Sequence, residues 1–187
     1  MLPNDRFFKG MYSVEFEGRT YYRFYRVLRQ GKLRLVIHII SVNSTSKQGI
    51  AFQFSRKPKY RGTLAINGIV FAPKKKQQYY VLPVLWPEQK EIVIDLDIKD
   101  GYFVLANASD YLDDDPLMTE NISKMTGRTR DNFRENSFSS GFTAANIYGN
   151  AFWIETLSEN CLRFYCNDHK MNDDFNDMVF DLNIMIF

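Results

Sequence analysis

The residue types best suited to chemistry gather near the C-terminal end of the chain, just before its last apolar run. Calcium takes six to eight hard oxygen ligands from flexible loops, and this segment supplies many of them in few residues. The spacing does not fit an EF-hand, because the glycine and the closing glutamate of that loop are missing. An alternative is that the same side chains form turns that start the last strand. The candidate ligands are Asp168, Asp173, Asp174, Asn176 and Asp177.

The string NDDFNDMVFDLNI, which begins at Asn172, also carries a resemblance. It resembles the closing motif of the bacterial extracellular β-sandwich domains of unknown function found in large adhesins, where an acidic D-[FY]-N-D turn precedes an apolar last strand. The resemblance covers about fifteen residues. It implies a β-sandwich binding module in which Asp174, Asn176 and Asp177 shape or ligate the last turn.

A second candidate site lies near the N-terminus, where cationic and aromatic residues alternate. Arg19, Tyr21, Arg23 and Tyr25 fall on one face of a predicted strand, and Arg34 follows on its predicted hairpin partner. Rings that stack on bases and guanidinium groups that pair with phosphates are typical of single-stranded nucleic-acid binding. The alternative is an ordinary solvated or protein-binding sheet face stabilised by cross-strand pairs.

Trp86 is a further candidate for contact with a partner. It is followed by Pro87 in a proline-rich run, and proline cannot donate a sheet hydrogen bond. We therefore expect this run to form an edge or bulged segment, with Trp86 more exposed than the other aromatic residues.

The sequence gives little support for an enzyme. His38 and His169 lie in neither a metalloprotease motif nor a nucleophile elbow, and the sequence has no glycine-rich phosphate-binding pattern. Cys161 and Cys166 are five residues apart on a predicted strand, which places them on opposite faces as free thiols. A non-enzymatic protein is favoured, and a hydrolase that acts through loop carboxylates stays open as an alternative.

The elements that must position these residues are strands. In residues 33–40 and 91–99 apolar side chains recur at every second position, the period of a strand with one buried face. Asn67-Gly68 and Asp100-Gly101 separate pairs of apolar runs and predict hairpin turns. The last run, from Val179, is continuously apolar at its start, as expected of a buried strand.

These patterns predict one all-β domain over residues 1–187, a two-sheet β-sandwich or jelly roll. Residues 108–149 differ, because Asp, Ser, Thr, Asn and Gly dominate there. They predict a long polar loop that carries one short helix at about residues 117–125.

The two halves of the chain carry opposite charge. Residues 1–90 hold 17 Lys and Arg against four acidic residues, a net charge of +13, whereas the remainder holds 7 against 18, a net charge of −11. Such asymmetry suits a charged partner or head-to-tail self-association. The alternative is that the halves interleave in space and neutralise one another.

We therefore expect a non-enzymatic interaction or assembly module, with calcium as its one candidate ion. A protein partner or self-assembly is favoured, and nucleic-acid binding is the alternative. The sequence contains no run of 18 apolar residues and no signal-peptide pattern at its start. These absences predict no membrane insertion and favour a location inside the cell or in an assembled particle.

Overall fold

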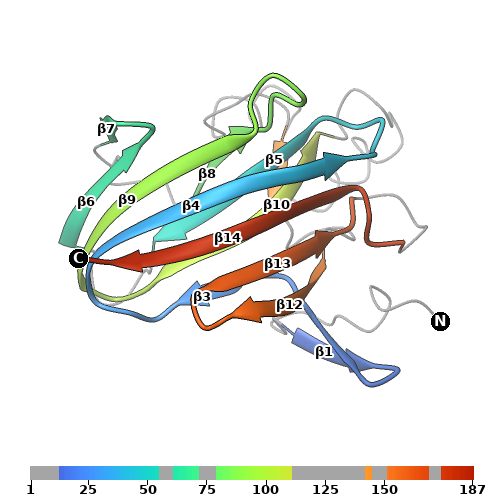
Figure 1. Ribbon diagram of the computed structural model, residues 1–187, viewed down its shortest axis with the longest axis horizontal. Coiled ribbons are helices and arrows are strands. Elements are labelled where there is room, and N and C mark those ends of the chain that lie inside the picture. The colour runs from blue at the N-terminus through green and yellow to red at the C-terminus, as the bar shows by residue number, and fades with distance from the viewer. Residues whose placement is uncertain (1–12, 55–60, 72–78, 111–141, 145–150, 169–173) are drawn as a thin grey trace, which may run out of the picture.

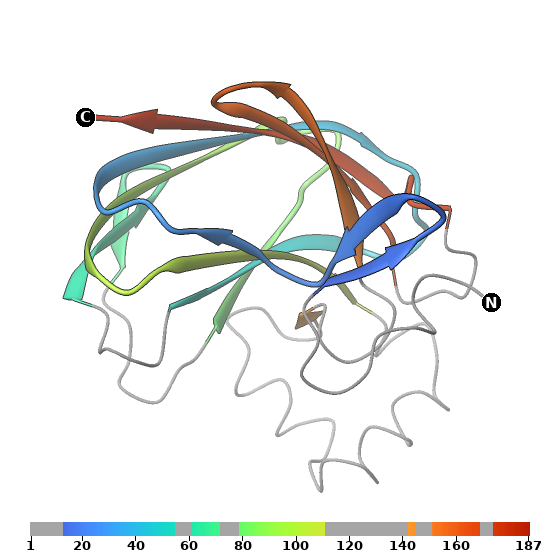
Figure 2. The ribbon, with the colours of Figure 1, turned by 90° about the horizontal axis from the view of Figure 1, so that it is seen from below.

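The computed structural model describes residues 13–54, 61–71, 79–110, 142–144, 151–168 and 174–187. Within these ranges every regular element is a strand, and all strand pairs are antiparallel. The strands form two sheets that pack face to face, one above the other in the view of Figure 2. The predicted fold class, an all-β two-sheet sandwich, is confirmed.

The larger sheet has nine strands in the order β1-β2-β12-β13-β14-β4-β9-β6-β7 (Figure 1). In that order the strands are Ser13–Phe16, Arg19–Tyr22, Phe152–Ser158, Cys161–Cys166, Met178–Ile186, Gly31–Val42, Glu91–Asp100, Arg61–Ile66 and Ile69–Phe71. The smaller sheet has the order β11-β10-β5-β8, and β3 also pairs with β10. Its strands are β11 (Phe142–Ala144), β10 (Phe103–Asp110), β5 (Gln48–Phe54), β8 (Tyr79–Pro83) and β3 (Tyr25–Val27).

The core forms where the apolar faces of the two sheets meet. The predicted alternation is confirmed in β4 and β9, whose alternate apolar residues are all buried. The smaller sheet contributes Ile50, Phe52, Phe103 and Leu105 to the same cluster. Removing one such side chain costs about 2–5 kcal/mol of stability, since a cavity remains. The buried residues of β4 and β9 are Leu33, Leu35, Ile37, Ile39, Ile92, Ile94, Leu96 and Ile98.

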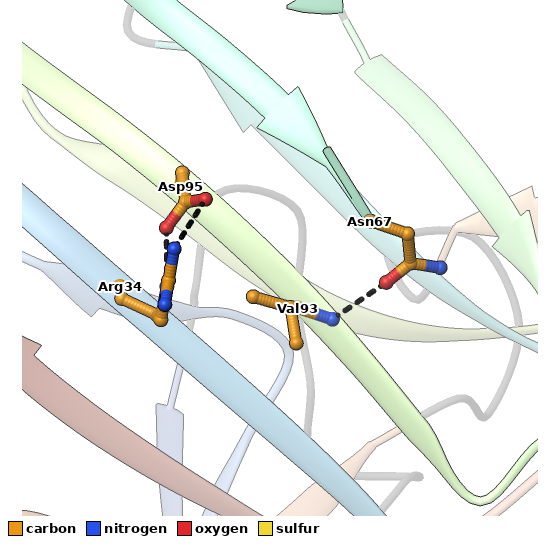
Figure 3. A network of polar contacts seen from close by, with 4 residues as sticks. All are labelled: Arg34, Asn67, Val93 and Asp95. Carbon is orange, nitrogen blue, oxygen red and sulfur yellow. Dashed lines mark hydrogen bonds and ion pairs between the residues drawn. The ribbon is translucent and has the colours of Figure 1, made fainter. Parts of the chain in front are cut away.

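The predicted hairpin at Asn67-Gly68 is confirmed between β6 and β7. Both residues have positive φ angles, 47° and 81°, which a type I′ turn requires. The Asn67 side chain also accepts a hydrogen bond from the backbone N–H of Val93 on β9, at 2.9 Å (Figure 3). This contact adds to the pairing of the hairpin with β9.

Three predictions of local pairing are wrong. Residues 19–25 do not form one strand, because β2 ends at Tyr22 in the larger sheet and β3 begins at Tyr25 in the smaller one. Neither β2 nor β3 pairs with β4, the predicted hairpin partner that carries Arg34, because β4 lies between β14 and β9. Asp100-Gly101 does not close a hairpin either, since β9 and β10 belong to different sheets. Gly101 does have the expected positive φ, 85°. Periodicity identifies strands but does not show where the chain crosses between layers.

Other predictions concern the margins of the fold. β8, which ends at Pro83, is an edge strand of the smaller sheet, as expected. The described ends of the predicted 108–149 loop include the end of β10 and the short strand β11. The predicted helix lies outside the described residues, and the single-domain assignment stays a prediction. No helix in the described part of the chain could cross a membrane.

Candidate functional site

The outer face of the larger sheet presents one row of side chains across five strands. The strand registers place Val70 of β7 opposite Ala65, Ala65 opposite Asp95, Asp95 opposite Arg34, and Arg34 opposite Met185 of β14. Arg34 and Asp95 lie on the face away from the core, because their neighbours along β4 and β9 are buried. Residues directly opposite each other share a face, so the register places the other three on the same side of the sheet. The row lies at the end of the sandwich that contains the C-terminus.

A two-pronged ion pair marks the centre of this row. Arg34 donates from Nε to Oδ1 of Asp95 at 2.6 Å and from Nη2 to Oδ2 at 3.0 Å (Figure 3). This hydrogen bonding raises the pKa of Arg34 and lowers the pKa of Asp95. Both side chains are well solvated, so the pair contributes little to stability. Its consequence is geometric, because it holds two opposite charges in a fixed orientation on the sheet surface.

Apolar side chains surround the ion pair and are exposed. Val70 and Phe187 are each 72% exposed, and Met185 is 47% exposed. The backbone N–H of Phe187 donates to the carbonyl of Lys32 at 3.1 Å, which holds the end of the chain beside β4. The Arg34 guanidinium lies 5.6 Å from the centre of the Phe187 ring, within the range of a cation–π contact.

Val70, Phe187 and the ion pair, but not Met185, line a shallow, open depression of about 440 Å³. Its charged residues form two opposed pairs, Lys32 with Asp97 and Arg34 with Asp95, so the side chains that line the depression carry no formal net charge. The remaining residues that line it are Leu33, Ala65, Val70, Leu96 and Phe187. A mixed apolar and charge-balanced surface of this kind suits contact with another protein surface.

The arrangement of strands also bears on the charge asymmetry between the two halves of the chain. β4, from the basic half of the chain, lies between β14 and β9, both from the acidic half. The Arg34–Asp95 pair joins one half to the other. In the described strands the two halves therefore interleave.

The five residues of the predicted basic and aromatic face are not brought together. Tyr21 is buried, and the Tyr25 ring meets the core ring of Phe164 edge-on at 5.4 Å. Burial lowers the pKa of Arg23. Arg19 lies 4.0 Å above the Trp153 ring, on a strand that three others separate from the strand of Arg34. The separation follows because the chain crosses from the larger sheet to the smaller one between β2 and β3.

Trp86 also differs from expectation, because it is half-buried and packs against the main core. The peptide bond between Trp86 and Pro87 is cis. The ammonium of Lys90 lies 5.9 Å from the centre of the Trp86 ring. The exposed large apolar residue of this segment is Leu85.

The candidate calcium residues occupy different environments. Asp168 and Asp177 are buried, while Asp174 and Asn176 are exposed, and Asp173 lies outside the described residues. Asp177 accepts a hydrogen bond from the backbone N–H of Asp168 at 2.8 Å. Asp174 accepts from the N–H of Asn176 at 3.3 Å, the pattern of an Asx-turn. Each contact shapes the backbone.

Sequence reasoning missed the residue that anchors this segment to the sheet. Phe175 has a positive φ of 54° and is only 5% exposed. Its ring lies 4.8 Å from that of Tyr21, within a small second cluster that includes Ala151 and the partly buried Trp153. The available signal was one aromatic residue within an otherwise polar run, since such a residue seeks an apolar contact.

The cysteines and the acidic residues are the remaining candidates for metal binding and for nucleophilic chemistry. Among the described residues, no three His, Cys, Asp or Glu side chains lie where they could share a metal ion. Cys161 and Cys166 are both free, as predicted. Burial and the nearby Asp177 raise the pKa of the Cys166 thiol, and burial raises that of Cys161. Both thiols are therefore poor nucleophiles at neutral pH.

Comparison with known proteins returns no relative: no family model, curated protein or solved structure matches the chain. The likeness of residues 172–184 to adhesin-type domains accordingly stays a prediction.

Proposed function

We propose that the protein is a non-enzymatic assembly module whose copies associate through the outer face of β4 and β9. The observation that carries the proposal is the exposed apolar surface of Val70, Met185 and Phe187 around the Arg34–Asp95 pair. Exposed apolar side chains that gather in one place are typical of protein interfaces, whereas scattered ones need no explanation.

The charge balance of this surface favours a second copy of the chain as the occupant. In a two-fold contact the same patch faces itself, so a surface with one sign of charge repels its mate. Here Lys32 and Arg34 stand opposite Asp97 and Asp95 on neighbouring strands. Such a surface is complementary to its own two-fold copy. A nucleic-acid surface, in contrast, needs an excess of cations.

Shape supports the same proposal. The depression lies beside β7, a short edge strand whose Ile69 and Val70 are both exposed. Two copies related by a two-fold axis would each place Val70 near the depression of the other. Burial of these side chains then supplies the apolar contribution to association.

Sedimentation velocity over a range of protein concentrations tests this function. We expect the wild type to dimerise as concentration rises, and Val70→Glu to weaken dimerisation roughly tenfold or more, because it buries a charge in the contact. Ile40→Glu is the matched control: Ile40 is also exposed, and it lies on β4, the strand of Arg34, near the end of that strand away from the association surface.

A wild-type chain that stays monomeric at its highest soluble concentration, at both low and moderate salt, contradicts the proposal. Equal weakening by Val70→Glu and Ile40→Glu also contradicts it, since the effect would then not belong to this surface.

A further inference from the structure

The opposite end of the sandwich has a polar interior. All seven buried polar side chains of the described residues carry an oxygen, and none is Lys, Arg or His. They come from the end of the β4–β5 connection, from β5 and β10, and from the segment between β13 and β14. These residues are Ser46, Gln48, Asn107, Ser109, Asn167, Asp168 and Asp177.

Gln48 and Asn107 lie on the inner face of the smaller sheet. Along β5 and β10 they continue the alternation of Ile50 and Leu105, which belong to the core. Gln48 stands opposite Ser109, two residues beyond Asn107. The two amides are therefore diagonal neighbours, whose Cα atoms lie about 7–8 Å apart in a sheet of this kind.

Each amide has one side-chain oxygen without a donor. Asn107 Oδ1 and Gln48 Oε1 are buried and accept no hydrogen bond in the described part of the structure. The amide nitrogens fix their orientation: Asn107 Nδ2 donates to the carbonyl of Asn167 at 2.6 Å, and Gln48 Nε2 donates to that of Ser46 at 3.1 Å. Turning either amide over would set two acceptors against each other.

Both amides belong to a hydrogen-bond network that reaches two buried carboxylates. Ser46 donates its N–H to the Ser44 hydroxyl at 2.9 Å, and Ser44 donates that hydroxyl to Asp168 at 2.6 Å. Asp168 in turn donates its N–H to Asp177 at 2.8 Å. On the other side, Asn107 reaches the carbonyl of Asn167, the residue before Asp168.

We propose that this buried cluster binds one calcium ion, with Gln48 Oε1 and Asn107 Oδ1 as ligands and Asp168 and Asp177 as the source of negative charge. Two buried amide oxygens that accept no hydrogen bond are available to a hard cation, and calcium takes amide, carboxylate and carbonyl oxygens. The site differs from one formed by the exposed Asp174 and Asn176, and it does not depend on the proposed self-association.

Thermal unfolding of chelator-stripped protein, with and without calcium, tests the proposal together with calorimetric titration. An ion bound only by the native state raises the unfolding temperature, by about 5 °C or more when calcium is roughly 100-fold above its dissociation constant. We expect that rise and one calcium ion per chain. Absence of both in the wild type overturns the proposal and leaves a polar cluster without an ion.

Two substitutions of one residue give opposite expectations. Gln48→Met keeps the length of the side chain but removes its oxygen, so it should abolish the calcium-dependent rise. Gln48→Glu adds a charge at the ligand position, so it should increase the rise, since the extra carboxylate is repelled without calcium and paired with it. Asp174→Asn is the control, and it should retain the wild-type rise.

A rise that survives in Gln48→Met, or one that Asp174→Asn removes, overturns the proposal. If Gln48→Met does not fold, Gln48→Glu decides the matter. In that case a rise no larger than that of the wild type contradicts the assignment.

Discussion

The two ends of this sandwich invert the usual distribution of polar and apolar side chains. Around the C-terminus Val70, Met185 and Phe187 are apolar and exposed. At the far end Asn107 and Asp168 are polar and buried. Each arrangement costs free energy in an isolated chain, because apolar surface stays in water at one end and oxygens leave water at the other.

The difference between the ends concerns what can offset that cost. Exposed apolar side chains are stabilised by a second apolar surface, which a protein partner supplies. Buried oxygens that accept no hydrogen bond are stabilised by a donor or a cation. This difference is why we propose macromolecular contact at the end with the C-terminus and a calcium ion at the end that contains Asp168.

The largest expected difference in stability is between variants of two phenylalanines, one at each end. Phe175 packs in the small cluster with Tyr21, whereas Phe187 is largely exposed. Phe175→Ala should lower the free energy of unfolding by about 3 kcal/mol, the usual cost of removing a buried ring. Phe187→Ala should change it by less than about 0.5 kcal/mol. Urea unfolding at a dilution that keeps the chain monomeric measures both.

Similar losses for the two variants would remove the distinction between the ends. In that case Phe175 would contribute no more to stability than an exposed residue in a loop.

A smaller effect is expected within the acidic segment. Asp177→Ala leaves the buried N–H of Asp168 without its acceptor and should cost about 2 kcal/mol in the absence of calcium. Asp174→Ala removes only an exposed turn contact, so about 0.5 kcal/mol is expected. Chemical unfolding in chelator provides both values, and equal costs would contradict the division into buried and exposed acids.

The reactivity of the two thiols should also differ, and measuring it requires no substitution. Cys166 is fully buried and its pKa is raised by burial, whereas Cys161 is partly exposed. A thiol reagent at neutral pH should modify Cys161 slowly and leave Cys166 intact until the chain unfolds. Mass spectrometry after timed modification shows which thiol reacts first. Faster reaction of Cys166 would show that the end of the sandwich that contains Asp168 opens readily.

The smallest effect concerns the ion pair on the association surface. Because Arg34 lowers the pKa of Asp95, the contribution of this carboxylate to stability is present above its unfolded-state pKa. That contribution is lost as pH falls through the lower folded-state value. In Arg34→Ala the Asp95 pKa should rise towards its ordinary value, which carboxyl NMR titration measures. An unchanged pKa would mean that the pair does not persist in solution.

Much of the fold was predictable because it depends on local periodicity. The alternation in β4 and β9 and the Asn67-Gly68 turn are properties of neighbouring residues. The crossings from β2 to β3 and from β9 to β10 were not predictable in this way. Which sheet a strand joins depends on pairing across the whole chain.

The candidate sites were less predictable for the same reason. Gln48 and Asn107 are 59 positions apart and become neighbours only through the register of β5 and β10. Sequence spacing placed Asp168 and Asp174 in one acidic group, although one is buried and the other exposed. The alternation of Arg19 and Tyr21 with later residues was real in the sequence, but the strand ends before it can form a surface.

Hydrogen–deuterium exchange under four conditions tests most directly whether the two ends have separate roles. The conditions combine dilute and concentrated protein with chelator and with calcium. Concentration should slow exchange in residues 31–36 and 184–187, and calcium should slow it in residues 44–50 and 105–109. If the same amides respond to both variables, or concentration protects none, the account of two independent ends is contradicted.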